Sequence, residues 1–101
     1  MKSKFHKLTI LILISMLLGC ATTIKQGAEG IQTITAQQKE KCKFISLIST
    51  EQKLGPDKPG NALKKAINMT YEMGGDSLYI VSTSTDWAEG ASVVGEAFRC
   101  K

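Results

Sequence analysis

The apolar residues of this chain follow two kinds of pattern, which together predict strands on either side of one helix. The stretch from Cys42 to Thr50 is rich in β-branched and aromatic residues, which is typical of a strand. From Asn61 to Met73, apolar residues recur at steps of three and four, which predicts an amphipathic helix. Asn61 is the expected N-cap of this helix, and Gly74 is expected to follow its last turn.

The two sides of the predicted helix differ in size and polarity. Ala62 and Ala66 lie within the apolar stripe, where small side chains let a helix lie close to a sheet. The residues expected to face outward are Lys64, Lys65, Asn68 and Glu72.

Two further strands are expected after the helix, at Ser77 to Thr83 and at Ala91 to Cys100. Residues 84–90 are expected to form a polar loop, and residues 54–60, with a Gly-Pro and a Pro-Gly pair, another. The order strand, helix, strand, strand predicts an α+β fold with one helix packed on a small, mostly antiparallel sheet.

The first and last strands match in phase. Pairing them brings Cys42 near Cys100 and the ring of Phe44 near that of Phe98. The residues expected to share one face of the first strand are Cys42, Phe44, Ser46 and Ile48.

Residues 1–19 have the pattern of an export signal. Three lysines, Lys2, Lys4 and Lys7, precede an apolar run from Leu8 to Leu18. As a helix this run rises only ~16 Å, about half of the ~30 Å hydrocarbon core of a bilayer. The run is therefore too short for a standard membrane span and fits the apolar core of a signal peptide.

The tetrapeptide Leu17-Leu18-Gly19-Cys20, directly after this run, looks like the lipobox of bacterial lipoproteins. Such a site requires a thiol as the nucleophile that takes the lipid, and a small preceding residue that gives a peptidase access. We therefore expect Cys20 to become the lipidated first residue of the mature chain. The alternative is a buried cysteine at the end of a core helix.

Two or three acyl chains on Cys20 would hold the protein firmly on a membrane, because each buried methylene contributes ~0.8 kcal/mol. The expected partners are thus the membrane and the machinery that processes and sorts lipoproteins. Ala21 stands where an aspartate would resemble an inner-membrane retention signal, which favours the outer membrane, with the domain facing the periplasm.

Residues 20–40 have the composition of a lipidated flexible tether, rich in Thr, Gln, Lys, Gly and Ala. A flexible chain of this length has a root-mean-square reach of ~25 Å. Ile31 to Thr35 is an alternative short strand within it. The globular domain is then expected over residues 41–101.

Removal of the signal changes the charge and the available chemistry. Three of the thirteen basic residues leave with it, so ten remain against nine acidic ones, which argues against nucleic acid as a partner. The one histidine, His6, leaves as well. Without imidazole for general-base catalysis or zinc binding, we expect no enzyme, no metal site and no cofactor beyond the covalent lipid.

With Cys20 assigned to lipid, Cys42 and Cys100 remain as an even pair in an exported chain, and we expect a structural disulfide. In the chain-entropy account, closing the loop between them contributes ~4 kcal/mol to stability. A redox-active or metal-binding pair is the alternative, but the Cys-x-x-Cys spacing is missing.

The expected polar loop holds the single tryptophan, Trp87. Tryptophan is enriched at interface hot spots, so Trp87 is a candidate anchor for a partner. The favoured interpretation is that it folds back over the sheet edge. Arg99 is a candidate grip for a carboxylate or phosphate, or one half of a cross-strand pair. Carboxylates that could bind a cation, but are favoured as turn-making or solvated groups, are Asp57, Asp76, Asp86 and Glu89.

Four segments carry a resemblance to a known family. They are Cys42 at the first strand, Asn61-Ala62-Leu63 at the helix start, Gly74-Gly75-Asp76-Ser77-Leu78 after the helix, and Gly95-Glu96-Ala97-Phe98-Arg99-Cys100. On these segments the domain resembles a family of small bacterial envelope lipoproteins known only as a domain of unknown function. That family is similar in fold to RcsF, the envelope-stress sensor lipoprotein.

The resemblance implies architecture more than activity, because these segments hold glycines, alanines and cysteines that determine a fold. We therefore expect a non-enzymatic, membrane-anchored lipoprotein of the bacterial cell envelope, with a structural role or a role in binding another envelope protein. Envelope-stress sensing is the alternative, and a metal-binding protein is less favoured.

Overall fold

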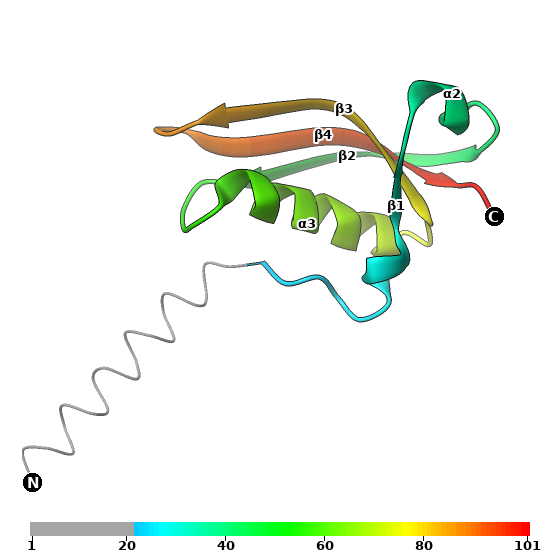
Figure 1. Ribbon diagram of the computed structural model, residues 1–101, viewed down its shortest axis with the longest axis horizontal. Coiled ribbons are helices and arrows are strands. Elements are labelled where there is room, and N and C mark those ends of the chain that lie inside the picture. The colour runs from blue at the N-terminus through cyan, green and yellow to red at the C-terminus, as the bar shows by residue number, and fades with distance from the viewer. Residues whose placement is uncertain (1–21) are drawn as a thin grey trace, which may run out of the picture.

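The computed structural model describes residues 22–101, so the expected signal peptide and Cys20 lie outside the described residues. Two layers make up the described chain: a four-stranded sheet and one long helix across one of its faces (Figure 1). The elements in order are η1 (Ala28–Gly30), β1 (Gln32–Ile34), α2 (Ala36–Lys39), β2 (Lys43–Gln52), α3 (Lys58–Glu72), β3 (Ser77–Asp86) and β4 (Gly90–Arg99). Between residues 22 and 101, no helix combines the length and apolar character that crossing a membrane requires.

The sheet has the strand order β1-β3-β4-β2. β4 pairs antiparallel with β2 on one side and with β3 on the other, and β1 joins the outer edge of β3 in parallel. Cys42 and Cys100 form a disulfide with their Cα atoms 4.4 Å apart. The expected α+β fold, with one helix on a mostly antiparallel sheet and one disulfide, is confirmed.

The pairing of β2 with β4 has the expected register but not the expected faces. Phe44 lies opposite Phe98, with their rings edge to face and centroids 5.7 Å apart. A β-bulge then follows at Ile45, between Phe44 and Ser46. Because the extra residue reverses the alternation of side chains, Phe44 and Ile48 lie on opposite faces, and the prediction of one shared face is wrong.

α3 begins one turn earlier than its sequence pattern predicted. Its N-cap is Asp57, whose Oδ1 accepts a hydrogen bond from the backbone N–H of Gly60 at 3.2 Å. The expected cap, Asn61, and the Pro59-Gly60 pair assigned to a loop lie inside the helix. Proline is tolerated in a first helical turn, where its missing N–H has no helical partner. The helix end is as predicted, with Gly74 in the left-handed region at φ +82°.

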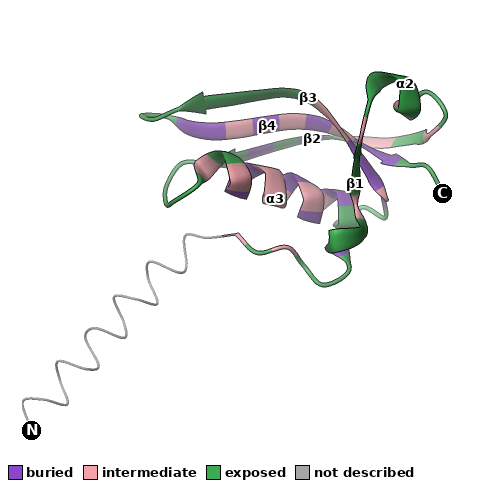
Figure 2. Ribbon diagram, in the orientation of Figure 1, coloured by how far each residue is buried: buried purple, intermediate pink, exposed green. Residues whose placement is uncertain are grey.

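The core lies between α3 and the sheet, and Figure 2 marks buried residues along α3 and along β4. Alanines on both sides make the approach close, since Ala62 and Ala66 on the helix are fully buried, as is Ala97 on β4. The buried apolar cluster comprises Ile48, Ala62, Ala66, Leu78, Ala91, Val93 and Ala97.

The described part of the expected tether, residues 22–40, is folded onto the domain. It contains η1, β1 and α2, and Ala28 within it is fully buried. Gln32 to Ile34, within the alternative short strand, pairs with Ser77 to Tyr79. A flexible tether is therefore the wrong description of residues 22–40, because backbone pairing and side-chain amides of α3 fix this segment.

Asn68 makes two of those contacts, and the prediction that it faces outward is wrong. Its Oδ1 accepts from the backbone N–H of Lys25 at 2.8 Å, and its Nδ2 donates to the carbonyl of Thr23 at 2.8 Å. Although the helical pattern placed Asn68 outward, it is buried beneath the amino-terminal segment. Earlier on the helix, Asn61 Oδ1 accepts from the backbone N–H of Thr22 at 2.9 Å.

Candidate functional site

The face of the sheet opposite α3 is the first candidate surface. Its side chains alternate with the buried residues of β2, β3 and β4, and none of the elements within residues 22–101 covers its centre. Phe44 and Leu47 on β2 are 51% and 65% exposed. We call this surface the open face and define it by Phe44, Leu47, Ser49, Tyr79, Ser82, Val94, Glu96 and Phe98. Apolar side chains left in water on one surface are typical of an interaction site.

One end of the open face is closed by a charged contact from α2. Lys39 Nζ donates to Glu96 Oε1 at 2.7 Å and lies 4.3 Å from the centre of the Tyr79 ring. The hydrogen bond to Glu96 is the main cause that raises the pKa of Lys39 above its usual 10.5. A cation over an aromatic face is attracted by the ring quadrupole, so this contact ties the amino-terminal segment to the open face.

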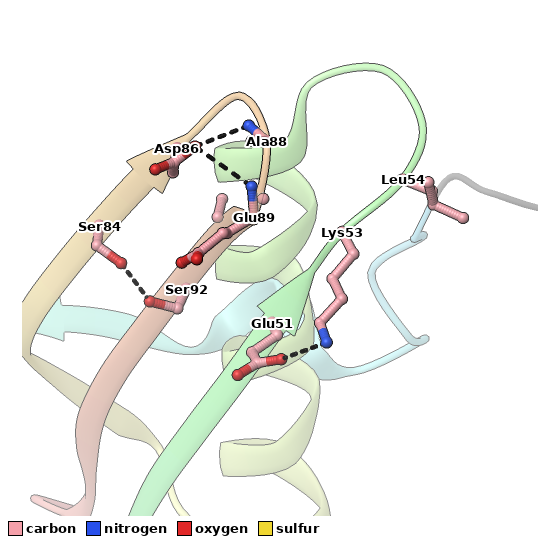
Figure 3. A pocket seen from close by; sticks show the side chains of 10 residues that line it. Glu51, Lys53, Leu54, Ser84, Asp86, Ala88, Glu89 and Ser92 are labelled. Carbon is pink, nitrogen blue, oxygen red and sulfur yellow. Dashed lines mark hydrogen bonds and ion pairs between the residues drawn. The ribbon is translucent and has the colours of Figure 1, made fainter.

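The other end of the sheet carries a hollow of about 540 Å³ between β2 and the β3–β4 hairpin (Figure 3). Ser84 Oγ and Ser92 Oγ share a hydrogen bond of 2.5 Å across its floor, and Lys53 lies 3.9 Å from Glu51. Its polar lining residues are Glu51, Lys53, Ser84, Asp86, Glu89 and Ser92. Within residues 22–101, no three His, Cys, Asp or Glu side chains are grouped so as to hold a metal ion.

Three of the four carboxylates considered as cation ligands bind backbone groups instead. Asp57 caps α3, and Asp86 Oδ1 accepts from the backbone N–H groups of Ala88 and Glu89 at 2.7 and 3.3 Å. These side chains make turns, as favoured from the sequence. Glu89 lines the hollow.

Asp76 is the most heavily used of these carboxylates. Its oxygens accept from Ser77 Oγ at 2.9 Å and from the backbone N–H groups of Cys100 and Lys101 at 2.8 and 3.0 Å. Burial acts to raise the pKa of Asp76, but the hydrogen bonds from Cys100, Ser77 and Lys101 outweigh it and lower this pKa below 3.8. The side chain therefore fixes the chain after β4 as an ionised carboxylate.

Trp87 lies at the tip of the β3–β4 hairpin. The strands on either side are longer than predicted, so the loop expected over 84–90 is reduced to the turn between Asp86 and Gly90. Trp87 is 89% exposed, so the favoured interpretation, that it folds back over the sheet edge, is wrong. Its carbonyl accepts from Lys58 Nζ at 3.2 Å, which joins the hairpin tip to the start of α3.

Arg99 has a role that neither sequence interpretation described. Its Nε and Nη2 donate to the carbonyl of Gly74 at 3.2 and 3.0 Å, so it fixes the chain just after α3. The candidate lipid site, Cys20, lies outside the described residues. Sequence reasoning missed the open face because the bulge at Ile45 exposes Phe44, and it missed the amide contacts of Asn61 and Asn68. The seven-residue spacing of those asparagines, which puts both on one side of a helix, is the signal that could have shown them.

Comparison with known proteins supports the fold and leaves the activity open. Neither a protein-family model nor a curated protein sequence matches the chain. A similar solved structure is the solution NMR structure of the secreted protein SrfN of Salmonella typhimurium LT2. It has 17% sequence identity and a TM-score of 0.57, over 67% of this chain and 84% of SrfN. At that identity the likeness concerns the fold alone.

Proposed function

We propose that this chain is a non-enzymatic, membrane-anchored lipoprotein of the bacterial cell envelope whose domain binds another envelope component through the open face. The observation that carries the binding role is the exposure of Phe44 and Leu47 on the sheet face opposite α3, where, within residues 22–101, α2 covers one end only. The anchor rests on the Leu-Leu-Gly-Cys sequence ending at Cys20 and on the acyl chains it would carry.

The composition of the open face suits protein recognition. Phe44, Leu47 and Val94 provide an apolar centre, and serines and the Lys39–Glu96 pair provide hydrogen-bonding groups around it. Interfaces commonly combine an apolar centre with a polar rim, and a few aromatic anchors contribute most of the binding free energy. The partner that fits is an envelope protein with a complementary apolar surface.

Envelope-stress sensing is the second candidate, and the position of α2 favours it. Lys39 belongs to the same amino-terminal segment that Asn61 and Asn68 hold, and it covers Glu96 and Tyr79. Release of this segment would therefore enlarge the open face. A sensor could use that change to exchange partners.

The anchor is tested by mass spectrometry of protein extracted from membranes. We expect an amino-terminal peptide that begins at Cys20 and carries two or three acyl chains. A soluble mature chain that begins at another residue would contradict the lipid anchor.

The binding surface is tested by in-cell photocrosslinking from position 47, with position 72 as the control. Leu47 is on the open face, whereas Glu72 is a half-exposed side chain on α3. We expect a specific envelope-protein adduct from position 47 alone. An adduct that changes under envelope stress favours sensing, and identical products from both positions would count against the open face.

A further inference from the structure

The amino-terminal end of the described chain is held at the hairpin end of the molecule (Figure 1). The backbone N–H of Thr22 donates to Asn61 Oδ1, and Asn61 Nδ2 donates to the carbonyl of Pro56 before α3. Cys20 precedes Thr22 by two residues, and two residues span at most ~7 Å. A lipid on Cys20 would therefore be held close to the start of α3, whereas a flexible tether would allow it ~25 Å.

The same end presents the two most exposed large apolar side chains of residues 22–101, Trp87 at 89% and Leu54 at 72%. Trp87 belongs to the β3–β4 turn and Leu54 to the β2–α3 connection, and residues of both segments line the hollow in Figure 3. The bond from Lys58 Nζ to the carbonyl of Trp87 joins the hairpin to the helix start. An apolar pair thus projects from the end of the domain that receives the anchor.

We propose that this end is a bilayer-docking surface, in which Trp87 and Leu54 enter the interfacial layer of the membrane that holds the lipid anchor. The proposal rests on the proposed lipid anchor. Tryptophan partitions to the membrane interface, where its ring contacts acyl chains and its N–H meets headgroups and water. Two side chains bind a bilayer weakly from solution, but an anchor at the same end of the domain makes their insertion intramolecular.

The charges around this surface indicate the kind of bilayer. Two lysines, Lys53 and Lys58, stand against four carboxylates around this surface, so its net charge is −2, which disfavours an anionic bilayer. The carboxylates are Glu51, Asp57, Asp86 and Glu89. We therefore assign a zwitterionic phospholipid bilayer as the partner of this surface. The lysine ammonium groups would reach lipid phosphates while their alkyl chains lie along the apolar layer. Docking in this orientation turns the disulfide end of the domain and the Lys39–Glu96 end of the open face away from the membrane.

The single tryptophan makes the proposal directly measurable in the full lipidated protein. The protein is reconstituted into phosphatidylcholine–phosphatidylethanolamine vesicles with and without acyl chains brominated near the headgroup, and Trp87 fluorescence is recorded. Insertion is expected to shift the emission to shorter wavelength and to give quenching by the brominated lipid. Emission typical of water-exposed indole, without such quenching, would overturn the docking surface.

A matched pair of variants locates the contact. Leu54→Ser removes one of the two inserted apolar side chains and is expected to lower the ratio of docked to undocked protein by at least about tenfold, equivalent to about 1.4 kcal/mol. Leu47→Ser removes a leucine of similar exposure from the open face and is expected to leave the quenching unchanged. Equal effects of the two variants would overturn the assignment.

Vesicle flotation distinguishes failure of the docking surface from failure of the lipid anchor. A chain that does not float with the vesicles overturns the lipid anchor and the docking surface together. A chain that floats while Trp87 stays exposed overturns the docking surface alone. A shift to shorter wavelength that grows with protein density, without quenching by brominated lipid, identifies self-association and also overturns it.

Discussion

At the scale of single residues, two asparagines determine the position of the amino-terminal segment. Asn61 and Asn68 reach from one side of α3 to backbone groups of Thr22, Thr23 and Lys25. An amide side chain can donate and accept at once, so Asn68 satisfies an N–H and a carbonyl of a segment that would otherwise expose both. Polar side chains, rather than apolar burial, hold most of this stretch before Ala28.

Removing the amide of Asn68 should release the segment. Each of its two hydrogen bonds contributes about 1 kcal/mol, so Asn68→Ala is expected to lower the free energy that holds residues 22–27 in place by about 2 kcal/mol. Tryptic cleavage after Lys25 should then accelerate strongly. Glu72→Gln removes the exposed ion pair between Glu72 and Lys25 and is the control, because such pairs contribute under about 1 kcal/mol. Equal cleavage rates in the two variants would contradict the role of Asn68.

Asp76 should make the stability of the folded domain depend on pH in the acidic range. Its pKa is lowered in the folded state, so the unfolded chain binds the proton more tightly, and this stabilisation is present above pH 3.8. As the pH falls through the folded-state pKa, the contribution of Asp76 is lost. We expect the melting temperature of Asp76→Asn to lie below that of the unchanged chain at pH 6 and the difference to shrink at pH 2.5. A constant difference across this range would exclude the carboxylate as its source.

At the scale of elements, the start of α3 depends on the side-chain cap and on the space left for it. Asp57 caps the helix from the left-handed region, at φ +48°. A Cβ at Gly60 would overlap the Asp57 carboxylate, so a glycine is needed where the cap closes. The Pro59-Gly60 pair that suggests a loop is thus part of the helix start.

The cap can be tested without touching the core. Asp57→Ala is expected to destabilise the domain by about 1–2 kcal/mol, since it removes the cap and places alanine at a positive φ. Asp57→Asn keeps an oxygen acceptor and a residue that tolerates this conformation, and should cost well under about 1 kcal/mol. Urea unfolding followed by circular dichroism measures both variants. Equal losses would show that the oxygen acceptor at position 57 is dispensable.

The sequence predicted the elements better than their ends and faces. Periodicity placed α3 and the three long strands, and phase alone paired Phe44 with Phe98 and brought the cysteines together. The bulge at Ile45 was not predictable, because an unpaired residue depends on both strands at once. Residues 22–40 were misjudged because their order comes from long-range amide contacts, which leave no periodic signal in the segment itself.

Among the candidate site residues, too, local sequence signals were informative, whereas features that depend on the tertiary structure were missed. Trp87 was singled out because a lone tryptophan in a polar loop is a local signal. The structure shows that it is exposed, and its role as an anchor stays a prediction. The open face required knowledge of which side α3 covers, and alternation alone does not say that. Arg99 was misread because its acceptor, the carbonyl of Gly74, lies 25 residues away in sequence.

At the scale of the whole molecule, the disulfide closes a loop that includes α3 and three of the four strands. Such a closure limits the unfolded chain and contributes ~4 kcal/mol in the loop-entropy account. We expect reductant to lower the urea midpoint of the oxidised protein by a corresponding amount. The Cys42→Ser, Cys100→Ser double variant should start at the lower midpoint and be insensitive to reductant. A reductant effect on that variant would point to another cause.

That closed loop begins at Cys42, and so it leaves residues 22–41 outside. A force applied through the proposed lipid anchor would therefore act first on the asparagine amides and the short β1–β3 ladder, and only afterwards on β2 and the disulfide. Once these contacts break, residues 22–41 can extend to about 70 Å before the force acts on β2. With the proposed anchor and partner in place, force between them would unfold residues 22–41 first and leave the disulfide-closed part of the domain folded.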